Sequence, residues 1–361
     1  MTPGTVFSRV YVESGAREYP ICREILARLR TLPVTEISNY HEVFSRPRQS
    51  FAAQKRMPAL ILAVKSGTFL YRGGDRINSW QRDSVHYNDL VRNCVYDCEY
   101  CFLQGMHPSA NAVVFVNVDD YFAATQQALE EAGSLFLSIS YLTDLLGFEP
   151  IVPYTRKWID FARSRSRLQL EIRTKSDNYP ALRGIEAAQN IVFVWSIAPA
   201  GVAAAIERGT ASFPNRLFAA RSAIQAGFRV RLCFDPVILR AGWEEEYRTA
   251  VRETFRRLPA ERIEFVSVGG LRMGVDQFSK FRKDNPSRAR LFTPYRSVDR
   301  MVSYSATAEA RVVEVMGEAI GKFLPDERIK FLTSTQPGRE AAGPADRSPT
   351  GRRDVFRRLP Q

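Results

Sequence analysis

The strongest constraint on the fold is a regular alternation of short apolar runs with longer amphipathic segments. The runs are Ala112–Asn117, Leu135–Ser140, Leu168–Thr174, Ile191–Ile197, Phe228–Phe234 and Ile263–Val268, with a last strand at Ile329–Thr333. The segments of helix length are Asp119–Ala132, Tyr154–Ser164, Pro214–Ala226, Trp243–Arg257 and Thr307–Phe323. This alternation predicts parallel βαβ units. About six such units predict an α/β fold, a partial (β/α)6 barrel with its chemistry at the carboxyl ends of the strands.

Three regions are expected along the chain. Residues 1–80 are predicted to form a small N-terminal α/β segment, with a strand at Val10–Ser14 and a helix near Tyr19–Leu32. Residues 81–335 are predicted to form the partial barrel. Residues 336–361 are rich in Pro, Gly and Arg and have no hydrophobic period, so we expect a flexible, disordered basic tail.

Charge and hydropathy narrow the range of partners. The chain has 51 basic and 39 acidic residues, a net charge of +12, which favours a polyanionic partner such as DNA. A GC-rich genome would explain the excess of Arg over Lys, but not the net charge. The sequence has neither an apolar run of membrane-spanning length nor a secretory signal, and we expect a cytoplasmic protein without membrane contact.

Three of the five cysteines form a C-x3-C-x2-C motif at Cys94, Cys98 and Cys101. Five cysteines are too few for a disulfide framework in a chain of this length, and clustered thiolates are typical iron–sulfur ligands. Three thiolates leave one iron of a 4Fe-4S cluster open, where the amino and carboxylate groups of S-adenosylmethionine (AdoMet) can bind. A zinc site with His107 as its fourth ligand, or chance clustering of cysteines, are the alternatives.

The motif and its surroundings resemble a known family. C-x3-C-x2-C followed by an aromatic residue is the signature of the radical AdoMet (radical SAM) superfamily, and NCVYDCEYCFLQGMHPSANAVVFVN resembles the spore photoproduct lyase family. The likeness continues in FAAQKRMPALILA, IERGTASFPNRLFAA, FDPVILRAGWEEEY and VSVGGLRM, and it extends from about Val10 to Thr333.

The resemblance implies a DNA-repair lyase with a partial (β/α)6 barrel. Members of the family revert a methyl-bridged thymine dimer. An adenosyl radical takes a hydrogen from the lesion, and a protein cysteine then returns a hydrogen through tyrosines. The implied substrate is damaged duplex DNA, with the lesion turned out of the base stack. A reductant such as flavodoxin or ferredoxin would supply the electron.

The resemblance assigns roles to individual residues. Cys94, Cys98 and Cys101 match the cluster ligands, and Tyr100 matches both a tyrosine of the hydrogen-return chain and a residue of the AdoMet site. AdoMet-contacting positions are matched by Lys175, Ser196 and, in place of the usual serine, Thr143, within a stretch that Asp144 and Gly147 anchor.

Two positions depart from the family pattern. Tyr141 stands where the family has its hydrogen-donating cysteine, and Phe102 stands where a second tyrosine is usual. Either Tyr141 is itself the donor, or Cys233 replaces the missing thiol. Cys233 shares a strand face with Arg231 and Asp235, although a buried structural thiol is the simpler interpretation. The chain therefore resembles a divergent family member with altered chemistry.

Three functions follow as hypotheses. The first is hydrogen abstraction from a pyrimidine lesion in DNA. The second keeps the radical chemistry but changes the substrate to a nucleotide, RNA or a peptide. The third is a non-enzymatic DNA-binding protein with a structural metal site. The stretch Arg290–Arg300, with its aromatic and basic residues, could contact DNA or form a packed loop.

Overall fold

The computed structural model describes residues 6–73 and 85–333. Its centre is a row of parallel strands in the order β18-β14-β13-β11-β10-β9, continued by β5 and the antiparallel β4. The bounds are β9 (Leu135–Ser138), β10 (Leu168–Thr174), β11 (Ile191–Ser196), β13 (Arg229–Val237), β14 (Ile263–Gly270), β18 (Ile329–Leu332), β5 (Val85–Tyr87) and β4 (Tyr71–Arg72). The partial (β/α)6 barrel predicted from the alternating pattern is confirmed.

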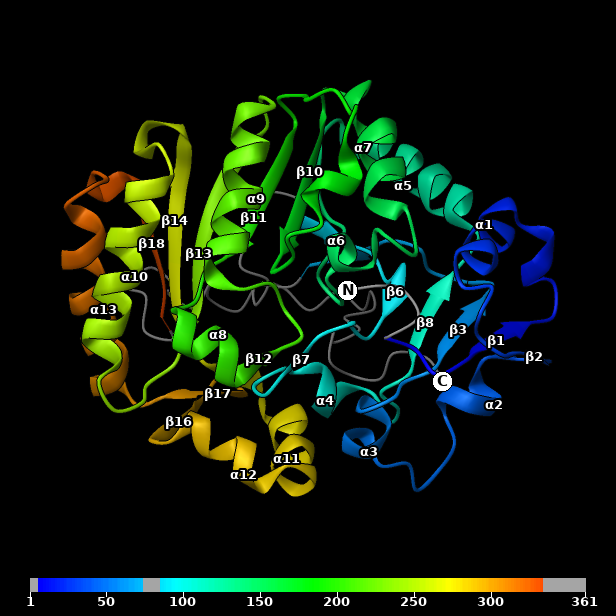
Figure 1. Cartoon of the computed structure of the whole chain (residues 1–361), viewed down its shortest axis with the longest axis horizontal. Helices are drawn as coiled ribbons and strands as arrows, with labels where there is room; N and C mark the ends of the chain where they lie inside the picture. Colours follow the sequence, from blue (N-terminus) through cyan, green and yellow to red (C-terminus); the bar gives the residue numbers. More distant parts are fainter. Residues whose placement is uncertain (1–5, 74–84, 334–361) are drawn as a thin grey trace, which may run out of the picture.

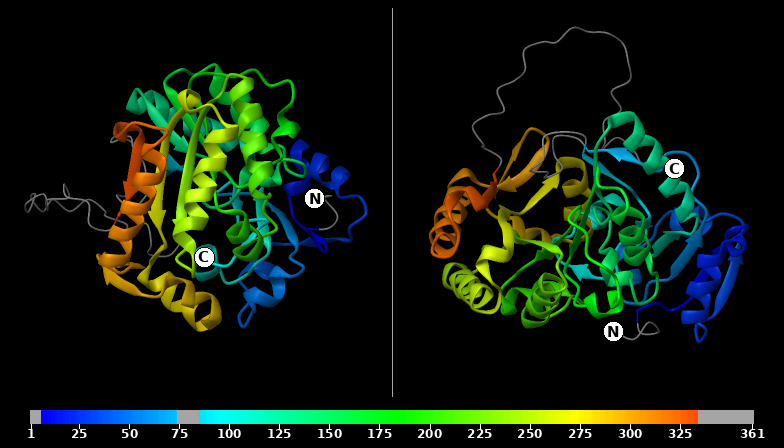
Figure 2. Two further views of the ribbon diagram at one scale, coloured as in Figure 1. Left: turned by 60° about the vertical axis from the view of Figure 1, so that its left-hand side comes forward. Right: turned by 90° about the horizontal axis from the view of Figure 1, so that it is seen from above.

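Amphipathic helices cover the outer face of this row (Figure 1). They are α5 (Val118–Ala132), α7 (Tyr154–Arg163), α9 (Phe213–Gln225), α10 (Trp243–Arg257) and α13 (Ala306–Gly321). Each turns its buried residues toward the strands, as at Trp158 and Ile159 of α7. Figure 2 shows the helices as an outer layer around the curved sheet.

A second sheet lies at the other end of the molecule from β18 (Figure 1). Its order is β2-β1-β3-β8-β6, with β1 (Val10–Glu13), β2 (Val34–Ile37), β3 (Leu60–Ala63), β8 (Ala112–Phe115) and the antiparallel β6 (Val91–Arg92). Its helix α1 is Pro20–Arg28. The run Ala112–Asn117, which we expected in the barrel, instead pairs in parallel with β3. All four β8 residues are buried, so either sheet could have accommodated them.

A third, antiparallel sheet holds the stretch that was expected to be either a DNA-contacting or a packed loop. It contains β15 (Arg272–Gly274), β17 (Met301–Tyr304) and β16 (Tyr295–Val298). The helices α11 (Val275–Asp284) and α12 (Pro286–Ala289) pack beside it. Arg290–Arg300 is thus largely a strand and the turn of a hairpin.

The remaining short elements connect the sheets. They are α2 (His41–Phe44), α3 (Phe51–Lys55), β7 (Asp97–Cys98), α4 (Leu103–Met106), α6 (Leu145–Phe148), α8 (Ala200–Ile206) and β12 (Glu207–Arg208). Helix α4 packs directly on α11, because a Cβ built on Gly105 would lie 2.2 Å from the carbonyl oxygen of Gln277. Within the described ranges, no helix is long and apolar enough to cross a bilayer. The expected tail, 336–361, lies outside those ranges.

Candidate active site

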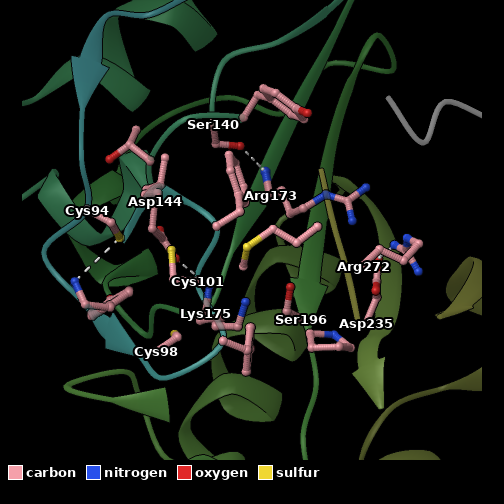
Figure 3. A pocket seen from close by; sticks show the side chains of 18 of the residues that line it. Cys94, Cys98, Cys101, Ser140, Asp144, Arg173, Lys175, Ser196, Asp235 and Arg272 are labelled. Atoms are coloured by element: carbon pink, nitrogen blue, oxygen red, sulfur yellow. Dashed lines mark hydrogen bonds and ion pairs between the residues drawn. The ribbon is translucent and has the colours of Figure 1, made fainter. Parts of the chain in front are cut away.

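A cavity of about 310 Å³ opens at the carboxyl ends of the barrel strands. Its wall contains residues at or within two residues of the ends of five neighbouring strands: Ser140, Lys175, Ser196, Asp235 and Leu271. The βαβ pattern predicted that the active site would lie at the carboxyl ends of the strands, and the cavity lies there. The three cysteines lie on one side of the cavity, and Asp235 and Arg272 lie on the other (Figure 3).

The cysteine motif forms a loop whose three thiols all face this cavity. Cys98 lies on β7, which pairs with β12, and Cys101 donates its backbone N–H to the Cys98 carbonyl at 3.1 Å. The side-chain amide of Gln104 donates to the same carbonyl at 2.8 Å, and the Lys55 ammonium donates to the Cys94 carbonyl. Contacts from several directions thus fix the loop before any metal binds.

A second set of contacts ties the loop to the small helices α11 and α12. Arg288 of α12 pairs with both carboxylate oxygens of Asp97 at 3.0 Å and also donates to Gln104 at 3.0 Å. Bidentate pairs of this kind fix orientation as well as distance. The cluster loop and the third sheet are therefore mechanically connected.

The donor set fits an iron–sulfur cluster better than a single metal ion. No three His, Cys, Asp or Glu side chains in the described part of the chain are close enough together to hold one ion. In a cubane each thiolate binds a different iron, so the sulfurs stand further apart than around one zinc. Burial raises the pKa of Cys94 to about 11, so iron must displace its proton.

His107, the expected fourth ligand of a zinc site, does not line the cavity. Its ring packs against Phe44 with a centroid distance of 5.5 Å, and its Nε2 is buried without a partner among the described atoms. Burial lowers the pKa of His107 to about 3, and the charges of Arg92 and Lys280 act in the same direction. The position of His107 does not support the zinc alternative.

Asp144 organises the segment between β9 and β10. Its carboxylate caps α6 by accepting from the Gly147 N–H at 2.9 Å, and it also accepts from the Thr174 hydroxyl at 2.8 Å and the Lys175 N–H at 2.6 Å. Thr143 lines the cavity and donates its hydroxyl to the Asn93 carbonyl at 2.8 Å. One buried carboxylate thus ties α6 to the end of β10.

Gly147 lies where a side chain would be crowded. A Cβ at this position would come within 3.0 Å of both the Tyr96 hydroxyl and a Val95 methyl group. The close approach brings α6 against the cysteine loop, which accounts for a glycine at this point.

The amino group of Lys175 belongs to a buried charge cluster that sequence reasoning missed. Its Nζ is 4.0 Å from Glu207, which pairs with the fully buried Arg216 at 2.5 Å. Arg216 also donates to the Ser196 carbonyl at 2.9 Å, and Tyr100 donates its hydroxyl to Glu207. The cluster therefore connects three of the residues predicted from the resemblance.

Charges within this cluster set its protonation. Burial opposes the ammonium of Lys175, but the surrounding negative charges, of which Glu207 is the strongest, together raise the pKa of Lys175. Burial likewise opposes the Glu207 carboxylate, but the charges of Arg216 and Lys175, together with the hydrogen bonds from Tyr100 and Arg216, lower the pKa of Glu207. Both groups are thus charged at neutral pH. The quoted segment IERGTASFPNR contains both Glu207 and Arg216, but nothing in its spacing indicates that they pair.

Tyr141 lines the cavity, and its ring contacts Tyr87 at a centroid distance of 4.9 Å and Phe102 at 6.0 Å. Burial raises the pKa of Tyr141, so its phenol keeps its hydrogen at neutral pH. The two residues that depart from the family pattern are therefore neighbours at the cavity wall.

Cys233 lies behind the cavity wall rather than on it. Its side chain is fully buried, and its sulfur lies 3.3 Å from the Arg173 guanidinium. Arg173 itself lines the cavity, and so does Asp235, which pairs with Arg272 at 2.7 Å. Arg231, on the same strand face, pairs with Glu264 and Glu171.

Comparison with known proteins assigns the chain to a family. The family model described as "Spore photoproduct lyase" matches residues 6–333. A spore photoproduct lyase from Geobacillus sp. is 23% identical over 338 residues, covering 90% of this chain and 98% of the relative. One from Clostridium acetobutylicum is 23% identical over 274 residues, covering 72% and 77%.

Solved structures show the same fold. A spore photoproduct lyase complexed with dinucleoside spore photoproduct has a TM-score of 0.75 at 20% identity, covering 91% of this chain and 98% of that chain. A double variant with bound AdoMet and dinucleoside spore photoproduct has a TM-score of 0.72 at 21% identity with the same coverage. Because the family model spans nearly the whole of the described fold, this chain belongs to the spore photoproduct lyase family.

Proposed function

We propose that this protein is a radical AdoMet lyase that abstracts hydrogen from a thymine-dimer lesion in DNA. One observation carries the proposal: Cys94, Cys98 and Cys101 share one cavity with Lys175 and Ser196, in a chain of the spore photoproduct lyase family. When bound, the 4Fe-4S cluster and AdoMet supply a 5′-deoxyadenosyl radical. The protein positions that radical and excludes water from it.

The residues around the cysteines have distinct tasks in this proposal. The Lys175 ammonium attracts the carboxylate of AdoMet, and the Ser196 and Thr143 side chains orient the rest of the molecule. Tyr100, held by Glu207, forms a fixed wall beside the third cysteine. Asp144 keeps the Lys175 backbone in place and need not touch the ligand itself.

We assign hydrogen return to Tyr141 rather than to Cys233. Tyr141 faces the cavity, whereas Arg173 stands between the Cys233 sulfur and the cavity. In this step the Tyr141 hydroxyl gives its hydrogen to the substrate carbon radical. A phenol does so less readily than a thiol, so the radical lives longer and by-products are expected.

The substrate side of the cavity carries Arg173 and Arg272, which pair with Glu171 and Asp235, and the chain has a net charge of +12. Three family structures contain dinucleoside spore photoproduct, which supports a lesion in damaged duplex DNA as the substrate. We further propose that the protein works in the cytoplasm and takes its electron from a flavodoxin or ferredoxin.

The test uses anaerobically reconstituted full-length protein with AdoMet and a one-electron reductant. We expect 5′-deoxyadenosine to form, and ultraviolet-irradiated DNA and a synthetic spore-photoproduct dinucleotide to yield thymine products. A Cys98→Ala variant is the matched control and should form no 5′-deoxyadenosine. Zinc in the purified protein, or failure to assemble iron and sulfide, would contradict the proposal.

A second candidate keeps the chemistry and changes the substrate to a nucleotide, RNA or a peptide. The observation in its favour is the pair Tyr141 and Phe102, which replaces two residues of the usual hydrogen-return chain. Deuterium placed at C6 of the saturated thymine ring of the dinucleotide separates the two candidates, because only a radical at that carbon can break the bond to the methylene bridge. Label appearing in 5′-deoxyadenosine supports the lesion, and its absence during turnover supports another substrate.

A further inference from the structure

Three tyrosines form a continuous series that leads away from the cavity. Tyr141 lies at the cavity wall, Tyr87 contacts it at a ring-centroid distance of 4.9 Å, and Tyr71 stacks on Tyr87 at 5.3 Å with an interplanar angle of 21°. Tyr141 lies in the loop after β9, Tyr87 lies on β5 and Tyr71 lies on β4. Strand β5 pairs with both β9 and β4 at the edge of the barrel sheet. We call these residues the tyrosine series.

The series ends at a buried group of charges between the two large sheets. The Tyr71 hydroxyl lies 3.0 Å from the Lys65 ammonium, which pairs with Asp89 at 3.2 Å. Asp89 is fully buried and also pairs with Arg92 at 3.0 Å. Two cations share one carboxylate beside Tyr71, and their positive charge favours reduction of a radical that has reached Tyr71.

The surroundings confine a radical on Tyr141 to the series. Tyr87 is 4% exposed, and it packs with Leu103 and Leu142 in an apolar cluster apart from the main core. Of the two described rings that contact Tyr141, only Tyr87 carries a hydroxyl, since the other belongs to Phe102. Burial raises the pKa of Tyr87 and of Tyr71, so both phenols keep their hydrogens at neutral pH.

We propose that Tyr141, Tyr87 and Tyr71 form a radical relay that carries the oxidising equivalent from the substrate to a reducible end beside Lys65. The relay rests on the proposed function, because the substrate radical is its source. In this chain the relay replaces the return of hydrogen through a tyrosine beside the cluster. Phe102 stands at the position of that tyrosine and has no hydroxyl hydrogen to pass on.

The electron and proton balance is as follows. The substrate carbon radical takes a hydrogen atom from the Tyr141 hydroxyl, forming a C–H bond and a Tyr141 phenoxyl radical. One electron and one proton then pass from Tyr87 to Tyr141, and from Tyr71 to Tyr87. A one-electron donor of the class that reduces the cluster reduces the Tyr71 phenoxyl, which takes its proton from solvent. Overall, the substrate radical gains one electron and one proton.

The experiment places 3-aminotyrosine at position 71 of the full-length chain. This residue is oxidised more easily than tyrosine, so it traps a radical that reaches the end of the relay. The reconstituted protein is mixed with AdoMet, the dinucleotide and a limiting amount of dithionite, and it is frozen for electron paramagnetic resonance. We expect an aminotyrosyl signal at position 71, and most of it should be lost in the Tyr87→Phe background.

Tyr121→Phe is the matched control, because the Tyr121 hydroxyl lies 3.4 Å from the same Asp89 while its ring contacts Phe69 rather than the series. The signal should survive in this variant. Formation of 5′-deoxyadenosine is measured in every sample. If it forms and the position-71 signal is absent, or is unchanged by Tyr87→Phe, the relay is wrong and the proposed function stands. If it never forms, both are wrong.

Discussion

At the scale of single residues, the site depends on which atom offers its hydrogen to the substrate. Tyr141 lies at the cavity wall, and its ring contacts Tyr87 and Phe102. These contacts fix the orientation of the ring and therefore the position of its hydroxyl. A thiol at this position would be shorter and would react faster with a carbon radical.

We therefore expect Tyr141→Cys to increase the proportion of clean thymine product over by-products in the dinucleotide assay. The double variant Tyr141→Cys with Phe102→Tyr should increase it further, because it restores both hydroxyl and thiol donors. Liquid chromatography with mass spectrometry measures the ratio. An unchanged ratio in both variants would show that hydrogen is returned from elsewhere.

His107 gives a prediction about stability and pH. Its folded pKa of about 3 lies below its ordinary value of 6.5, so the unfolded chain binds the extra proton as the pH falls below 6.5. The native state should lose about 2 kcal/mol from this group between pH 7.5 and pH 5. His107→Phe and His107→Gln should both remove that loss in urea unfolding experiments. A pH dependence equal to that of the parent protein would contradict the burial of a neutral ring.

At the scale of elements, the connection between β9 and β10 depends on one carboxylate. Asp144 accepts hydrogen bonds from Gly147, Thr174 and Lys175, and removing it leaves three donors without their acceptor. The same change frees the end of β10, where Lys175 must stand if it is to bind AdoMet.

We expect Asp144→Ala to lower the free energy of unfolding by about 3 kcal/mol, since buried donors lose a charged acceptor. Ser50→Ala, which removes only the cap of α3, should cost about 1 kcal/mol. AdoMet affinity, measured by calorimetry on the reconstituted protein, should fall in the first variant and stay unchanged in the second. Equal effects of the two substitutions would mean that Asp144 is only a helix cap.

The elements were predictable to different degrees. The helix expected at Trp243–Arg257 has those bounds in the structure, because its apolar face repeats with the helical period and its first turn is acidic. The run at Ala112–Asn117 is a strand as expected, but it pairs with β3 in the second sheet instead of joining the barrel. A strand that is buried on both faces is apolar throughout, so its sequence does not indicate which strand it pairs with. The ion pair between Glu207 and Arg216 has no recognisable pattern in the sequence, and it could be identified only from the structure.

At the scale of the whole molecule, buried interactions cross the boundary that was expected at residue 80. Strand β3, before residue 80, pairs with β8, after it, and Lys65 pairs with Asp89 across the same boundary. The division at residue 80 stays a prediction about folding units, and these contacts lead us to expect that residues on both sides unfold together.

Two probes can test this expectation. Cys22 is buried in α1 of the N-terminal segment, whereas Trp158 and Trp195 are buried in the barrel. During urea unfolding, labelling of Cys22, located by mass spectrometry, should follow the tryptophan fluorescence with the same midpoint. Labelling of Cys22 at lower urea would show that the N-terminal segment is an independent unit.

The contact of α4 with α11 has a consequence for how this gene can evolve. At Gly105 even one added methyl group would overlap the Gln277 carbonyl, and backbone atoms cannot swing aside as a flexible side chain can. Every codon change away from glycine there displaces the helix that follows the third cysteine. Selection on the chemistry of the cysteines therefore acts on a position that never meets the substrate.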